Sequence, residues 1–190
     1  KSELVGSRLN QASEIWASKG ATTRVAFISM GLNAGQFLFA AAFDDFSSTM
    51  TAMESVYMDP AMQELMQQRE REPGGKMIGP NMFRTIYGEL GTLQEKAHMI
   101  RYYQMLRHNI PAAIELMGEI DALSDDLNLT AVAPVAHEQM GMIAGVYRFN
   151  SMAHAGKAID EVGMSEAFQN LVNKANTLGT LTSAQMNITL

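Results

Sequence analysis

Cysteine is absent from the 190-residue chain, which excludes a disulfide framework, a thiolate-bound zinc ion and a thiol nucleophile. An excess of basic residues is also missing, because the formal net charge is -6. Nucleic acids and anionic lipid surfaces bind basic faces, so we expect no nucleic acid and no membrane as a partner. The longest uninterrupted apolar run, residues 37–43, has seven residues, far short of a membrane span.

Sequence motifs of common enzyme classes are missing as well. The chain contains no GxGxxG, no P-loop and no GxSxG, the signatures of dinucleotide sites, nucleoside triphosphate sites and serine hydrolases. What is present is a hydrophobic fraction of 47%, which is enough to bury a core. Because no signal-peptide pattern opens the chain, we expect a cytoplasmic globular protein.

An internal repeat organises the chain. Residues 35–66 align without a gap to residues 141–172, an offset of 106 positions. The eight identical pairs are Gly35/Gly141, Phe43/Phe149, Ala52/Ala158, Val56/Val162, Met58/Met164, Ala61/Ala167, Gln63/Gln169 and Leu65/Leu171. Since the apolar positions also stay in phase, we interpret the chain as a tandem duplication, with one copy over residues 1–92 and the other over residues 93–190.

Apolar periodicity, caps and breakers predict the elements of each copy. In the second copy they predict strands at 97–106, 127–135, 142–149 and 183–190 and helices at 109–125, 151–162 and 165–175. In the first copy they predict helices at 2–18, 47–57 and 60–71 and strands at 24–30, 36–43 and 82–90. This is the βαββαβ order of ferredoxin-like domains, with the first strand of copy one missing. We expect about ten further residues upstream, or a partner that covers the exposed sheet edge.

Two ferredoxin-like copies in one chain resemble the dimeric α+β barrel superfamily. It includes antibiotic-biosynthesis monooxygenase-like, NIPSNAP-like and stress-responsive A/B-barrel proteins, with the haem-binding chlorite dismutases as larger tandem relatives. The opening Lys1-Ser2-Glu3-Leu4 is similar to the PGK-x-x-E-L segment that joins the first strand to the first helix in these proteins. The resemblance implies an α+β fold in which antiparallel sheets form a barrel, helices cover its outside and the protein is a homodimer. The interior of such a barrel is the default site for a small-molecule ligand.

Arginine and tyrosine side chains on strands are the first candidates for ligand binding. Alternation sends Arg101 and Tyr103 to one face of the strand at 97–106, and the strand at 142–149 carries Tyr147 and Arg148. An arginine and a phenol can orient an anionic or carbonyl group by charge-assisted hydrogen bonds. The alternative is an arginine that reaches solvent and a tyrosine that packs. Both faces of these strands are largely apolar, so the alternation leaves open which face is interior.

Histidines provide the remaining candidates. His98, on a strand, and His154, near the start of a helix, are candidate general bases or axial haem ligands. The more common role, a surface or capping histidine, competes with both. No metal site is predicted, because His137 begins like HExxH but lacks the second histidine. Asn187 begins a glycosylation sequon inside a predicted strand, which we interpret as accidental.

Three functions remain open at this point. The first is a barrel that binds a small, mainly apolar molecule and, if it is an enzyme, acts without a cofactor in a monooxygenase-like way. The second is a haem-binding protein of the chlorite-dismutase type, with His154 or His98 as the iron ligand. The third is a non-catalytic oligomeric interaction protein whose barrel is filled by side chains.

Overall fold

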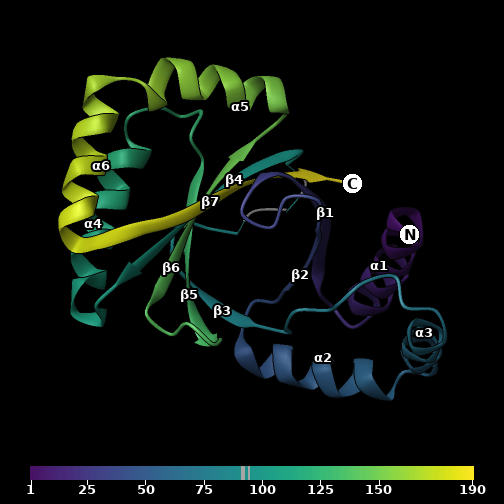
Figure 1. The fold of residues 1–190 in the computed structure, drawn as a ribbon. Helices are drawn as coiled ribbons and strands as arrows, with labels where there is room; N and C mark the ends of the chain where they lie inside the picture. Colours follow the sequence, from purple (N-terminus) through teal and green to yellow (C-terminus); the bar gives the residue numbers. More distant parts are fainter. Residues whose placement is uncertain (91–92, 94) are drawn as a thin grey trace.

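A computed structural model describes residues 1–90, 93 and 95–190. Its strands form one curled antiparallel sheet of seven strands in the order β2-β1-β7-β4-β6-β5-β3, which lies between two groups of helices (Figure 1). The strands are β1 (Thr22–Gly31), β2 (Phe37–Ala42), β3 (Met82–Tyr87), β4 (Ala97–Met105), β5 (Leu129–Ala136), β6 (Met142–Phe149) and β7 (Gly179–Thr189). The helices are α1 (Ser2–Ser18), α2 (Phe46–Met58), α3 (Pro60–Arg71), α4 (Ile110–Asp121), α5 (Met152–Ala158) and α6 (Glu166–Leu178), with a 3-10 turn, η1 (Arg107–Asn109), and a π-helical turn, η2 (Ile159–Gly163).

The second half of the chain has a ferredoxin-like topology. Its four strands lie in the order β7-β4-β6-β5, so the first strand of the unit is central and pairs with the third and the fourth. Helix α4 connects β4 to β5, and α5, η2 and α6 connect β6 to β7. Helices α4, α5 and α6 cover the outer face of these strands (Figure 1). The predicted α+β fold is thereby confirmed.

The first half of the chain completes the sheet and leaves one gap in it. Strand β1 pairs with β7 at one side of the second half, and β3 pairs with β5 at the other side. The two ends of the strand order are β2 and β3. In a ferredoxin-like unit the first strand lies between the third and the fourth, which are β2 and β3 in this half. Among the described residues no strand lies between β2 and β3, and this is the place of the strand that the sequence predicts to be missing from copy one.

Two apolar clusters hold the helices on the sheet. The larger lies between the second-half strands and α4, α5 and α6, and the fully buried Ile143 belongs to it. The smaller packs Val56 of α2 and Leu65 of α3 against α1, where the ring of Trp16 lies 6.3 Å from that of Phe39. Burial of these side chains is the main source of stability for both layers. No helix in the described part of the chain is long and apolar enough to cross a membrane.

Several element ends differ from the sequence prediction. Strand β7 begins at Gly179, four residues before the predicted start, because a bulge lets it follow β4 to its end. Asn109 precedes α4 as predicted, but its side-chain amide donates to the carbonyl of Leu178 (2.7 Å) and does not cap the helix. The predicted helix start at Pro60 is confirmed.

Candidate functional site

The contacts of the strands settle which face of the sheet is inner. Side chains alternate between a helix-covered face and the inner face of the curled sheet. Met99 on β4 and Tyr147 on β6 pack among the helices, so both belong to the covered face. Their neighbours His98 and Arg148 therefore point to the inner face.

Buried polar side chains form a row across three adjacent strands on this inner face. His98 of β4 lies directly opposite Arg148 of β6 and directly opposite Asn187 of β7. His98 and Asn187 are 0% exposed and Arg148 is 6% exposed. Gln185, two residues before Asn187 on the same face, donates its amide N–H to the Asn187 Oδ1 (3.0 Å). A core of this kind is normally apolar, so the row needs a reason beyond packing.

Arg24 adds a second guanidinium to the inner face. Its neighbour Thr23 faces α1, where the hydroxyl of Ser13 lies 2.7 Å from that of Thr23, so Arg24 points inward. Arg24 is 8% exposed and forms no ion pair with any residue in the described ranges. Burial lowers the pKa of Arg24 to about 10, against the opposing effect of the Glu95 charge, and the charge of Arg148 lowers it further.

Arg148 is anchored to the chain around it. Its guanidinium donates to the carbonyls of Leu90 (2.6 Å) and Glu89 (2.7 Å) and to the Asn128 Oδ1 (2.7 Å). These three bonds tie β6 to the segments that precede β4 and β5. Arg148 is therefore a structural and positioning residue more than a free ligand donor.

Glu95 and His98 complete the charge distribution. The Glu95 Oε1 lies 3.6 Å from the Arg148 Nη1, and its Oε2 lies 4.0 Å from the His98 Nε2. Burial lowers the pKa of His98 to about 3, and the charges of Arg24 and Arg148 act in the same direction. His98 is therefore neutral near pH 7 and makes no ion pair with Glu95.

We call Arg24, Glu95, His98, Arg148, Gln185 and Asn187 the inner polar cluster. Each of these six residues has at least one buried side-chain nitrogen or oxygen with no hydrogen-bond partner among the described residues, and both ring nitrogens of His98 are among these atoms. Buried polar groups in folded proteins are almost always hydrogen-bonded. So many unsatisfied donors and acceptors on one face indicate a place that receives a polar molecule.

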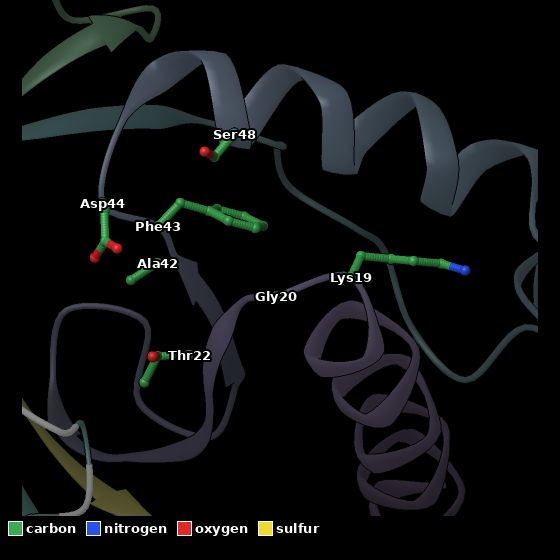
Figure 2. A pocket seen from close by; sticks show the side chains of 7 residues that line it. All are labelled: Lys19, Gly20, Thr22, Ala42, Phe43, Asp44 and Ser48. Atoms are coloured by element: carbon green, nitrogen blue, oxygen red, sulfur yellow. The ribbon is translucent and has the colours of Figure 1, made fainter.

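A pocket of about 300 Å³ lies where β1 begins and β2 ends (Figure 2). It is lined by Lys19, Gly20, Thr22, Ala42, Phe43, Asp44 and Ser48. Thr22 pairs with Ala42 and Arg24 pairs with Ala40, so two of the lining residues, Thr22 and Ala42, share the strand face of Arg24. In Figure 2, Thr22 and Ala42 point away from α1, whereas Phe43 points toward Lys19. None of its lining residues belongs to the inner polar cluster.

The other candidates from the sequence lie outside the cluster. Arg101, Tyr103 and Tyr147 share the helix-covered face, where the Arg101 guanidinium lies 5.9 Å from the centre of the Phe168 ring. Burial raises the pKa of Tyr147 to about 12, so its phenol stays protonated. This group contacts helices, and only His98 and Arg148 of the six candidates are brought together on the inner face.

His154 is also separate from the cluster. It lies in the first turn of α5, where its Nδ1 accepts from the Asn150 N–H (3.3 Å) and its Nε2 lies 3.3 Å from the Asp126 carboxylate. Its ring packs edge-on against Phe149. Both ring nitrogens are therefore occupied. No group of three or more His, Asp or Glu side chains in the described ranges is placed to hold a metal ion.

No protein-family model matches the chain, and no curated protein matches it by sequence. Solved structures do match its fold. A "putative monooxygenase" from Lactobacillus acidophilus superposes with a TM-score of 0.58 at 4% identity, covering 97% of this chain and 86% of that one. A "putative monooxygenase" from Fusobacterium nucleatum gives 0.61 at 8% identity, covering 100% and 87%. An anthrone oxidase-like protein gives 0.54 at 9% identity, covering 100% and 86%.

The chain has the ferredoxin-like α+β-barrel fold. The sequence resemblance to this superfamily, which rested on element order and duplication, is confirmed at the level of fold. At identities of 4 to 9% the similarity shows the fold alone, and the chemistry of this α+β barrel has to be argued from its own residues.

Sequence reasoning missed four members of the inner polar cluster. Arg24 is the first residue of the predicted strand at 24–30, and a charged residue at the end of a strand is usually exposed. Glu95 lies outside every predicted strand and helix. Gln185 and Asn187 sit two residues apart and so share one strand face. That spacing of two amides in a predicted strand was a usable signal, but Asn187 was interpreted only as part of a sequon.

Proposed function

We propose that the inner face of this α+β barrel binds a small, mainly apolar molecule that carries an oxygen group, and that the protein oxidises it as a cofactor-independent monooxygenase-like enzyme. The observation that carries the proposal is Arg24, a buried guanidinium without an ion pair among the described residues. Burying a charge without a partner is costly. A ligand oxygen that pairs with Arg24 would remove that cost, which favours binding at this position.

Apolar contacts surround the polar groups. Ile28, which pairs with Asn187, and Ile100, which pairs with Gln185, are 4% and 6% exposed on the same face. Apolar surface of this kind holds the body of a ligand, while a few polar groups fix its orientation. The ligand that we propose is an aromatic ring system with an oxygen substituent directed at Arg24.

The names of the solved relatives include an anthrone oxidase-like protein and "putative monooxygenase", and the inner polar cluster can support such a reaction. The substrate is a cyclic ketone whose ring CH2 is made acidic by conjugation with the carbonyl across the ring. The CH2 loses one proton to solvent and gives an oxyanion, which the charge of Arg24 stabilises. Electrons pass from this anion to O2, a C–O bond forms at the former CH2 carbon, and the peroxide anion takes a proton back from solvent. The peroxide then loses water. The CH2 becomes C=O, with one O2 consumed and one H2O released.

Substitution of Arg24 tests this proposal, with anthrone as the probe. The wild-type protein should consume one O2 per anthrone and form anthraquinone. Arg24→Met should weaken anthrone binding or turnover about tenfold or more, because a charge-assisted bond is lost. Arg101→Met is the matched control, because it removes an arginine from the helix-covered face. If Arg24→Met binds and oxidises anthrone as well as the wild-type protein does, the proposal is refuted.

Haem binding is the alternative function, and a titration of the protein with haemin distinguishes it from this proposal. His154 has no unoccupied ring nitrogen, so His98 is the histidine that the alternative requires. We expect haemin to produce no stoichiometric shift of the Soret band. A Soret shift that saturates at one haemin per protein and is lost in His98→Ala would show that the protein binds haem, and the oxygenase proposal would be wrong.

A further inference from the structure

We infer that the ligand of the inner polar cluster is a monoanion, and that Glu95 is the residue that determines this charge. The inference rests on the proposed function, because the monoanion is the deprotonated, oxyanion form of the substrate at the same site. It follows from how the charges of the cluster are distributed and paired.

The cluster carries one uncompensated positive charge. Arg24 and Arg148 are positive, Glu95 is negative and His98 is neutral. Arg148 has the Glu95 carboxylate at 3.6 Å. Arg24 has no carboxylate within 4.0 Å among the described residues. One negative charge on a ligand therefore completes the pairing.

The backbone holds Glu95 in its place next to the site. The Thr189 hydroxyl donates to the Glu95 carbonyl (2.7 Å), and the Thr189 N–H donates to the carbonyl of Lys96 (3.0 Å). These bonds attach the residue to the end of β7. The Glu95 Oε2 is buried and has no hydrogen-bond partner in the described part of the chain, so no hydrogen bond offsets the carboxylate charge at this oxygen.

Charge then discriminates among ligands of the same shape. A monoanion pairs with Arg24 and also meets neutral groups, the amide of Asn187 and the ring of His98. A neutral isostere offers Arg24 an uncharged acceptor and leaves the positive charge uncompensated in a buried site. A dianion brings a second negative charge close to Glu95, where repulsion is strong because water is largely excluded. Glu95 is thus a specificity-determining residue.

Three naphthalene probes test the inference by calorimetric titration at pH 7.5. They are 2-naphthoate, 2-naphthamide and naphthalene-2,3-dicarboxylate, which carry one, no and two negative charges on the same ring system. In the wild-type protein we expect 2-naphthoate to bind about tenfold tighter than either of the others. In Glu95→Gln, the dicarboxylate should gain about tenfold relative to 2-naphthoate, because the opposing charge is gone.

Glu119→Gln is the matched control, because Glu119 is an exposed carboxylate of α4 that pairs with Lys174. It should leave the binding ratios unchanged, and far-ultraviolet circular dichroism should show both variants folded. Equal affinity of the amide and the carboxylate in the wild type, or an unchanged dianion-to-monoanion ratio in Glu95→Gln, would overturn the inference while leaving a binding site in place. No binding of any probe up to millimolar concentration would also overturn the inference, and the proposed function falls with it only if the wild-type protein neither binds nor oxidises anthrone.

Discussion

At the scale of single residues, His98 makes the stability of the barrel sensitive to acid. Its pKa falls from 6.5 in the unfolded chain to about 3 in the folded protein, so below pH 6.5 the unfolded state binds the extra proton. Stability is therefore fully present above pH 6.5 and is lost as the pH falls toward 3. The slope contributed by this one residue approaches about 1.4 kcal/mol per pH unit.

Urea unfolding at pH 7, 6 and 5 measures this effect. The free energy of unfolding should fall more steeply with acid in the wild-type protein than in His98→Gln, whose amide has a similar size and does not titrate. Carboxylates that affect both proteins cancel in the comparison. Parallel pH profiles of the two proteins would show that folding does not lower the pKa of His98.

The sequence could identify some residues of the candidate site but not their grouping. His98 and Arg148 were candidates because each is a polar group on a predicted strand. Their pairing across β4 and β6 depends on register, which one sequence does not determine. Arg24 joins them only because β1 pairs with β7, a contact between residues more than 150 positions apart. Long-range pairing of this kind leaves no local pattern.

At the scale of elements, the seam between β1 and β7 depends on a glycine. Gly31 has a φ of +81°, and a Cβ at this position would collide with the carbonyl oxygen of Ala184, which accepts the N–H of Leu32 (2.8 Å). Gly31→Ala should therefore lower the free energy of unfolding by about 2–3 kcal/mol. Gly35→Ala is the matched control, since Gly35 has a φ of +90° with open space around it.

Denaturant titration of the two glycine variants separates backbone strain from the collision. Gly35→Ala reports the cost of a left-handed conformation alone, about 1 kcal/mol. The additional loss of unfolding free energy in Gly31→Ala measures the collision between β1 and β7. If both variants lose the same free energy, the close approach of β1 to β7 does not contribute.

Element prediction succeeded where the signal was local. Pro60 at a helix start and the short link between β5 and β6 follow from proline geometry and hairpin length. The early start of β7 did not follow, because Gly179 to Thr182 become a strand only through pairing with β4. Partner strands thus decide the ends that residue propensity leaves undetermined.

At the scale of the whole molecule, the two halves of the chain should unfold together. They share one sheet through β1–β7 and β3–β5, so neither half can open without breaking a strand pair of the other. Trp16 is the single tryptophan and lies in the first half, where its ring packs against Phe39 and Phe43. Its fluorescence therefore reports on that half alone.

Coincident urea transitions by Trp16 fluorescence and far-ultraviolet ellipticity are the expected result, since a cooperative unit shows the same midpoint with both probes. A fluorescence midpoint at lower urea than the ellipticity midpoint would mean that the first half unfolds on its own. The first half is the one expected to unfold first in that case, because its strands β2 and β3 are the two ends of the sheet.

In the sequence alignment of the two copies, Arg148 of the second copy corresponds to Ala42 of the first. Arg148 ties three segments together by hydrogen bonds, whereas Ala42 is a small residue that lines the pocket at the ends of β1 and β2. A pair of identical single-repeat chains related by a two-fold axis would have to present the same side chain at both places. Joining the copies in one chain removes that constraint, so the interior of this barrel is asymmetric: one of two equivalent positions holds a hydrogen-bonded arginine and the other holds an alanine that lines a pocket.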